Sequence, residues 1–361
     1  MVLIIMLSIV AGMVVWNGTF LKTKYDSAQD NYDHEQASMT ETQFQLIRAG
    51  IQAASSHNMQ PWKIKIIDDQ SFVLYADLTK HLPIIDPDYQ QLLMGQGTFI
   101  ALIRATAEQL GIALEVNYHP LNMEEELPII ATFTSDAHED STIDSVTAAS
   151  AGSESEEPSF AVHEATQFIH DLAPKYVVKW IAEENRSEFQ DYLYTATEIE
   201  AENQQAMEEM LDVFRFTKWE KNKYRYGLSL NTIGPPLNTF IPPIVGLTAQ
   251  WKSFGKATIN SFEERLANEE LYLVLALENP TQSDYIEVGE VITGLTQRVA
   301  GFTLRPAVQI LQPLAGMEEV YREMHEVIGI EGEIIQIIGF TKKDNAFHDS
   351  IRHQVMDLIL E

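Results

Sequence analysis

The chain has 361 residues, 45% of them hydrophobic, and a formal net charge of −29 at pH 7. This length allows one large domain or two fused half-domains. The sequence contains no cysteine, which excludes disulfides, thiolate metal ligands and cysteine nucleophiles. A surface this acidic argues against a nucleic-acid partner, because such binding depends on neutralising phosphates with Lys and Arg. An anionic cofactor would need a locally basic site.

Residues 1–21 form an uncharged and mostly apolar stretch, and about 20 such residues are enough to cross a bilayer as a helix. We therefore predict a single-pass N-terminal membrane anchor. A cleaved signal peptide is one alternative, although no basic region precedes the apolar run, and a buried helix is the other. Lys22 and Lys24 follow the stretch, so the positive-inside rule places the main domain in the cytoplasm. Residues 22–37 would form a polar tether.

A helix, a polar loop and a strand are predicted in succession after the tether. Residues 38–41 have the spacing of a capping box, and an apolar stripe at helical period follows from Phe44 to Ile51. Residues 62–67 alternate apolar and polar side chains as a strand does, and Pro61 cannot lie inside the helix. The hydroxyl and amide side chains of residues 53–62 could therefore bind the polar edge of a ligand, a phosphate or a ribityl chain.

The remaining chain divides by composition. Residues 135–159 are acidic and polar with almost no large apolar side chain, which predicts a disordered insertion. It separates an N-terminal half, residues 38–134, from a C-terminal half, residues 160–361. The C-terminal half begins with helical patterns up to about residue 216. Proline pairs then predict a loop or broken lid at about residues 231–246, because they cannot continue a helix.

The loop at residues 55–62 resembles the Ser-Ser-x-Asn-x-Gln-Pro-Trp flavin loop of the nitroreductase family. With its His57-Asn58 pair, the loop resembles that of the Acg-like branch of the family, whose members are single chains with an internal duplication. Further matches follow in order, and the resemblance covers residues 40–134 and 200–358, with the weaker matches in the second half. These further matches are Asp77, Leu82-Pro83, Asp86-Pro87-Asp88, a helix with Gly95 and Gly97 that ends at Gly111, Tyr272 to Leu275, Asp284, a helix from about Ile286 to Gly301, and a strand from Ile334 to Phe340.

This resemblance implies an α+β fold with the three-layer α/β/α arrangement of nitroreductases. Its two fused, pseudo-symmetric halves would mimic a homodimer, so the chain is expected to be a monomer or a weak dimer. Members of the family bind FMN at the subunit interface, which here would lie between the halves. Because only the first half carries the Ser55-Ser56-His57-Asn58 loop, one site per chain is expected.

The resemblance also assigns roles to residues. Ser55, Ser56, His57 and Asn58 would lie against the ribityl chain and ring edge of FMN, and Gln60 and Trp62 would brace the loop. Arg352 would pair with the phosphate, and Phe302 would pass over the flavin ring. No catalytic side chain is assigned, because the flavin performs the chemistry.

Simpler interpretations of the same residues stay open. The loop could only cap a helix, Arg352 could be a solvated residue paired with Asp349, and Phe302 could belong to the core. The Arg-x-Ser phosphate signature of the family has no convincing copy before the loop. Lys218, Lys221 and Arg225 are therefore candidates for additional phosphate-binding cations.

Two functions follow from these predictions. The first is an FMN-binding oxidoreductase that takes hydride from NAD(P)H and reduces a nitroaromatic, quinone or similar small-molecule acceptor. The second is a flavin-holding protein with a closed lid and little or no turnover. A homologue that has lost flavin is a third and weaker possibility. No metal site is predicted, because the ten histidines lack metal-ligand spacing.

Overall fold

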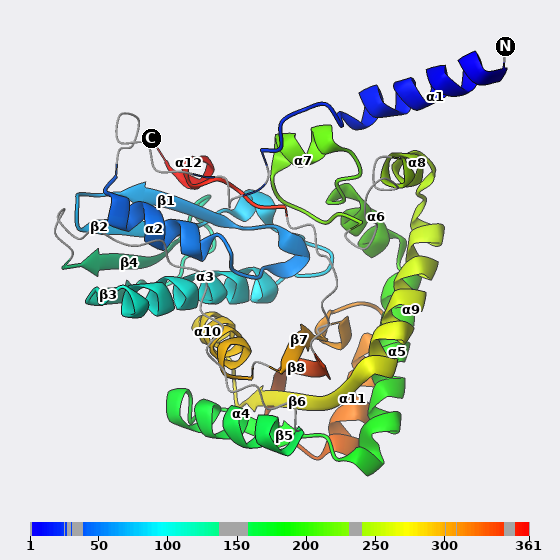
Figure 1. Cartoon of the computed structure of the whole chain (residues 1–361). Coiled ribbons are helices and arrows are strands. Elements are labelled where there is room, and N and C mark those ends of the chain that lie inside the picture. The colour runs from blue at the N-terminus through cyan, green and yellow to red at the C-terminus, as the bar shows by residue number, and fades with distance from the viewer. Residues whose placement is uncertain are drawn as a thin grey trace.

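The computed structural model describes residues 2–24, 26, 30, 39–136, 158–230, 240–299, 301–307, 309–342 and 351–360. The described chain is a mixed α and β structure with two four-stranded antiparallel sheets (Figure 1), which confirms the predicted mixture of elements. Most of the predicted tether and acidic insertion, and residues 231–239 of the predicted lid, lie outside these ranges.

The first sheet has the strand order β1-β2-β4-β3 and belongs to the predicted N-terminal half. Its elements, with the N-terminal helix, are α1 (Val2–Asn17), α2 (Glu41–Gly50), β1 (Trp62–Ile66), β2 (Ser71–Ala76), α3 (Gln90–Gln109), β3 (Leu114–Tyr118) and β4 (Ile129–Ser135). The predicted helix and strand on either side of the polar loop are thus α2 and β1.

The second sheet has the corresponding order β5-β6-β8-β7 and lies in the C-terminal half. The elements of this half are α4 (Pro158–Leu172), β5 (Val177–Trp180), α5 (Arg186–Glu202), α6 (Gln204–Asp212), α7 (Lys218–Tyr224), α8 (Ile241–Thr248), α9 (Trp251–Asn268), β6 (Glu269–Leu277), α10 (Gln282–Arg298), β7 (Phe302–Pro306), α11 (Met317–Ile328), β8 (Glu333–Lys342) and α12 (Val355–Leu358).

Local sequence explains why α2 and β1 form. Thr40 is the N-cap of α2: its side chain accepts a hydrogen bond from the Gln43 amide, and Gln43 returns one to the Thr40 backbone. In β1, Trp62 and Ile64 pair with Ala76 and Leu74 of β2, and these side chains are buried on one face. The alternation of β1 therefore buries one face of the first sheet beneath α2 and α3.

The two halves meet where α3 crosses α10 (Figure 1). At the crossing, a Cβ added to Gly97 of α3 would overlap the carbonyl oxygen of Ile286 in α10. Reciprocally, a Cβ added to Gly289 of α10 would overlap the carbonyl oxygen of Met94 in α3. Two glycines thus allow the helix backbones to approach more closely than side chains would permit.

The second sheet is buried on both faces. Leu273 and Leu275 of β6 join the apolar cluster that contains α3, α10 and α4. Tyr272 and Val274, on the opposite face, join a second cluster with residues of α5, α9 and α11. One acid lies within this second core: Glu200 of α5 is 3% exposed.

The predicted single-pass membrane anchor is wrong. Within the part of the chain that the structure describes, no helix has both the length and the apolar content needed to span a bilayer. Helix α1 has 16 residues, which at 1.5 Å per residue is about 24 Å against a hydrocarbon core of about 30 Å. Asn17 is its last residue, and Gly18 then adopts a φ of 71°, so the apolar stretch outlasts the helix. The cytoplasmic placement inferred from the anchor is withdrawn with it.

The described part of the predicted lid is also more regular than expected. Pro242 and Pro243 do not break a helix but lie in the first turn of α8, where a missing backbone N–H removes no helical hydrogen bond. Helix α8 contacts α1, and its Gly246 lies against the ring of Phe216. The predicted closure over a ligand depends on residues 231–239, outside the described ranges.

The segment after β8 returns to the first half. Ile359 forms a parallel bridge with Ile64 of β1, and the Leu360 amide donates a 2.7 Å hydrogen bond to the Ile64 carbonyl. Helix α12 also contacts α2 and β1. Residues 351–360 therefore bring C-terminal side chains to the end of the polar loop.

Candidate functional site

The polar loop has a strained backbone. Residues 56–58 form a short 3-10 turn between α2 and β1, and three non-glycine residues near it have positive φ: 49° at His57, 54° at Asn58 and 50° at Gln60. Side chains with a Cβ seldom adopt this conformation, and such strain persists only where surrounding contacts enforce it. The loop is therefore held in a specific shape by its neighbours.

Hydrogen bonds of Asn58 help to hold the loop in this conformation. Its Nδ2 donates to the carbonyl oxygens of Gly227 at 3.0 Å and Ile351 at 2.8 Å. Its backbone carbonyl accepts from the Gly227 amide at 2.9 Å. Asn58 thus links the N-terminal loop to two separate segments of the C-terminal half.

Gln60 makes a parallel set of links and is buried. Its Nε2 donates to the Arg225 carbonyl at 3.0 Å and its Oε1 accepts from the His353 amide at 3.0 Å. Gln60 therefore ties the loop to two segments of the C-terminal half.

Ser55, Ser56 and His57 form hydrogen bonds nearer to the loop itself. Ser55 Oγ accepts from the Gln60 amide at 2.9 Å. Ser56 Oγ donates to Gln91 Oε1 at 2.5 Å, which leaves its oxygen to accept from His57 Nδ1 at 2.8 Å. Burial lowers the pKa of His57 to about 4, so the imidazole is neutral at pH 7. His57 therefore brings no positive charge to the site.

The two predicted aromatic site residues occupy different places. Trp62 is buried below the loop, where its Nε1 donates to the Gly95 carbonyl at 3.0 Å and its ring lies 4.9 Å from that of Phe99. Phe302 is 3% exposed in β7 of the second sheet, and the centroid of its ring lies 6.1 Å from that of Phe340. Trp62 is thus joined to Gly95 of α3, whereas Phe302 packs in the core and is not brought to the loop by any contact among the described residues.

Arg352 lies against the loop. Its Nη1 donates to Asn58 Oδ1 and to the Ile351 carbonyl, while its buried Nε has no hydrogen-bond partner. No carboxylate of the described residues forms an ion pair with it, and Asp349, the predicted alternative partner, lies outside those residues. Burial lowers the pKa of Arg352 to about 10, so the guanidinium remains charged at pH 7. Such a cation favours a nearby anion.

A second buried guanidinium, which the sequence did not identify, lies on the other side of Gly227. Arg215 is 6% exposed and donates to the Asp212 carbonyl at 2.8 Å and the Tyr226 carbonyl at 3.2 Å. Its Cζ lies 4.3 Å from the Tyr224 ring centroid. Gly227 has a φ of 96°, and a Cβ on it would stand 3.2 Å from Arg215 Nε.

The cations predicted as additional phosphate ligands differ in their partners. Arg225 pairs with Asp357 at 2.8 Å, so a carboxylate already balances its charge. Lys218 and Lys221 lie on α7. Nothing in the sequence separates Arg215 from these residues, because its burial depends on rings that only the fold brings together.

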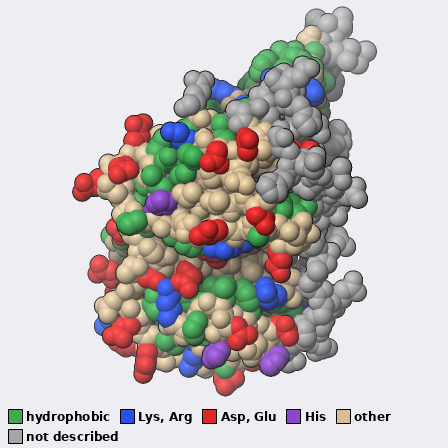
Figure 2. All heavy atoms as spheres, turned by 90° about the vertical axis from the view of Figure 1, so that its left-hand side faces the viewer, with side chains coloured by type: hydrophobic (Ala, Val, Ile, Leu, Met, Phe, Trp, Pro, Cys, Tyr) green, Lys and Arg blue, Asp and Glu red, His purple; other side chains and the backbone are tan. Residues whose placement is uncertain are grey.

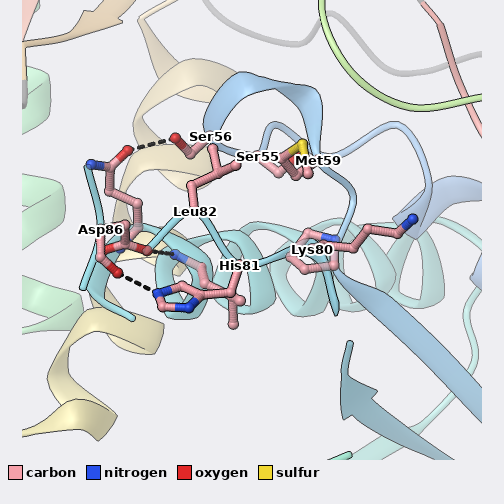
Figure 3. A pocket seen from close by; sticks show the side chains of 10 residues that line it. Ser55, Ser56, Met59, Lys80, His81, Leu82 and Asp86 are labelled. Atoms are coloured by element: carbon pink, nitrogen blue, oxygen red, sulfur yellow. Dashed lines mark hydrogen bonds between the residues drawn. The ribbon is translucent and has the colours of Figure 1, made fainter. Parts of the chain in front are cut away.

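A small cavity lies beside the loop, and Figure 3 shows the side chains that line it. Its lining includes Ser55, Ser56, Met59, Lys80 and Asp86, and its free volume is about 20 Å³, which holds about one water molecule. Burial raises the pKa of Asp86 to about 6, although its carboxylate accepts from the backbone amides that begin α3. The side chain of Lys80 places its Nζ 3.3 Å from the centre of the Tyr226 ring.

Comparison with known proteins adds no assignment to this geometry, since neither a protein-family model nor any curated protein sequence matches the chain.

Proposed function

We propose that the chain binds FMN between its two halves and acts as an oxidoreductase of the nitroreductase type. The observation that carries this proposal is Arg352, a buried cation without a carboxylate partner among the described residues, whose guanidinium contacts Asn58 of the polar loop. A guanidinium matches the planar oxygen geometry of a phosphate. The flavin phosphate supplies the anion that this site lacks.

The arrangement of the halves supports a flavin site between them. Both sheets have the same strand order, β1-β2-β4-β3 and β5-β6-β8-β7. In each half the second and fourth strands lie side by side at the centre of the sheet. Gly97 and Gly289 make reciprocal close contacts at the α3 and α10 crossing. A two-fold relation between two fused copies accounts for both observations, and the interface it creates is where a duplicated chain would hold one ligand.

The hydrogen-bond donors beside the loop suit the phosphate of FMN, but the cavity there is too small for the flavin ring. Ligand pockets occupy about 300–1,000 Å³, whereas the cavity beside the loop has about 20 Å³. Binding therefore requires the loop to separate from the segments that carry Gly227 and Ile351. The hydrogen bonds that now join Asn58 to their carbonyl oxygens would be exchanged for contacts with the ligand.

When bound, FMN would accept hydride from NAD(P)H and pass electrons to a nitroaromatic, quinone or similar acceptor. Arg352 would hold the phosphate, while Ser55, Ser56 and Asn58 would offer hydroxyl and amide groups to the ribityl chain. Trp62 and Gln60 would keep the loop in register through their contacts with Gly95 and His353. Asp86, with its pKa raised to about 6, could retain or release a proton near neutral pH.

The closed state of the loop favours a second candidate function. Every polar side chain from Ser55 to Asn58 has a hydrogen-bond partner within the protein, so the unliganded loop is closed. A loop that closed in the same way beside a bound flavin would cover it. The chain would then hold flavin with little turnover, because NAD(P)H could not reach the ring.

Visible absorption of the purified full chain, before and after addition of FMN, tests the proposal. A bound flavin spectrum supports it, and a chain that stays colourless and binds no added FMN refutes it. Anaerobic NAD(P)H then separates the two candidates. Rapid bleaching of the bound flavin indicates the oxidoreductase, whereas persistent colour indicates the flavin holder.

Arg352→Ala is expected to weaken FMN binding by about 1.5 to 3 kcal/mol, the scale of a lost charge-assisted hydrogen bond. Riboflavin has no phosphate, so its affinity should hardly change. Isothermal titration with both ligands measures the difference. Arg322→Ala, which removes an exposed guanidinium from α11, is the control and should bind both ligands as the parent does. Equal losses of FMN and riboflavin affinity in Arg352→Ala would exclude the phosphate role.

A further inference from the structure

Three segments of this acidic chain carry almost no acid: residues 2–24, α7 and α8. They contain a single acid, Glu220, and five cations: Lys22, Lys24, Lys218, Lys221 and Lys223. These segments therefore carry +4, while the chain as a whole carries −29. A net charge of opposite sign gathered in a few segments indicates a surface for an anionic partner.

The same segments expose large apolar side chains. Leu247 of α8 is 72% exposed, and Phe20, just after α1, is 63% exposed. Exposed apolar side chains of these segments also include Val10, Val15, Trp16, Trp219 and Ile244. So many exposed large apolar side chains in neighbouring elements are unusual in a protein that contacts only water. We call the surface formed by α1, residues 18–24, α7 and α8 the basic apolar face.

Specific contacts hold the parts of this face together. Trp219 Nε1 donates to the Val15 carbonyl at 3.1 Å, and the Trp219 ring stands edge-on to Phe20 with centroids 5.9 Å apart. Asn222 Nδ2 donates to the Lys22 carbonyl at 2.9 Å and its Oδ1 accepts from the Lys24 amide at 2.8 Å. The lysines after α1 are thereby fixed beside those of α7.

The figures place this face at one end of the molecule. In Figure 1, α1, α7 and α8 lie at the same end, and α1 extends away from the body. Figure 2 shows hydrophobic side chains with basic ones near their base at the top, above a body with many acidic side chains. The acidic body would be repelled by an anionic surface that attracts the basic apolar face.

We propose that the basic apolar face docks on an anionic lipid bilayer. The apolar side chains enter the headgroup region of one leaflet, and the surrounding lysines contact lipid phosphates. Aromatic side chains such as Trp16 and Trp219 suit the boundary between headgroups and acyl chains. This is contact with one surface of the bilayer and does not require a helix that crosses it. The repulsion of the acidic body sets the orientation of the docked protein.

Vesicle flotation of the full chain tests the charge. The parent should float with vesicles of phosphatidylcholine mixed with phosphatidylglycerol, and much less with phosphatidylcholine alone. Lys218→Glu, Lys221→Glu and Lys223→Glu together should reduce the bound fraction by about tenfold or more. The matched control, Lys65→Glu, Lys179→Glu and Arg322→Glu, changes the net charge equally at exposed positions elsewhere and should bind like the parent. Equal binding of both triple variants overturns the proposal.

A second pair of variants tests the apolar contribution. Ile244→Ser with Leu247→Ser should weaken binding to the mixed vesicles, whereas Leu172→Ser with Val327→Ser, at exposed positions of α4 and α11, should not. Circular dichroism checks that all variants are folded. If the parent fails to float and instead self-associates, and Ile244→Ser with Leu247→Ser restores the monomer, the partner is a second copy and the lipid proposal is refuted.

Discussion

Replacing Gly97 by Ala is expected to lower the free energy of unfolding by about 4 kcal/mol or more, at the upper end of single-residue effects. In an exposed helix this change would instead stabilise by about 1 kcal/mol. Here the added Cβ would overlap the Ile286 carbonyl oxygen across the α3 and α10 crossing. A backbone atom cannot rotate away, so the helices must separate and the core between the halves must open. Chemical denaturation followed by circular dichroism measures the loss.

Gly95 of the same helix provides the matched control. A Cβ there would meet nothing closer than Ser55 Cβ at 3.4 Å, which is an ordinary contact distance. Gly95→Ala should therefore leave the stability unchanged or slightly raised. If Gly97→Ala and Gly95→Ala had the same stability, the close approach of α3 and α10 would be wrong.

Glu200→Gln is expected to stabilise the protein by about 3 kcal/mol above pH 7 and to have little effect below pH 4.5, on linkage grounds. Burial raises the pKa of Glu200 from 4.5 to about 7 in the folded chain. The folded state therefore keeps a proton that the unfolded state releases, so the parent loses stability as pH rises through this window. The Gln312 amide donates to Glu200 Oε1 at 2.7 Å, and an amide at position 200 preserves that acceptor without a charge.

Denaturation curves of the parent and Glu200→Gln between pH 4 and 8 check the expectation, the two curves diverging as pH rises. The variant also offers an N–H to Gln312 Oε1, a buried oxygen without a hydrogen-bond partner. Glu198→Gln, at an exposed position of α5, is the control and should follow the parent at every pH. Parallel curves for Glu200→Gln and the parent would show that folding does not raise the pKa of Glu200.

Local patterns predicted the elements around the loop because their causes are local. The apolar stripe of α2 and the alternation of β1 depend on residues a few positions apart, and both elements form where expected. The N-cap was harder to place: Thr40, within the predicted capping sequence, makes the cap with Gln43. Family resemblance added the residues of the loop, and the structure brings Arg352 to it.

What the sequence could not provide were contacts between distant segments. Asn58 bonds to Gly227 and Ile351, and neither partner carries a signal, because each offers only a backbone carbonyl. Arg215 was missed for a similar reason, since its burial depends on Tyr224 and Tyr226 folding over it. The prediction of a membrane anchor was wrong for another reason. It counted apolar residues, and that count does not show that the helix ends before Gly18.

The pairing of Ile359 and Leu360 with Ile64 has a consequence for biosynthesis. Strand β1 is translated early and can pair with β2 on one side as soon as that strand emerges. Its other side must wait for residues 359–360. During synthesis this strand therefore presents an unpaired edge, which is a template for misassociation between nascent chains. The edge of β1 is covered only when residues 359–360 pair with it, and the risk of misassociation at this edge then ends.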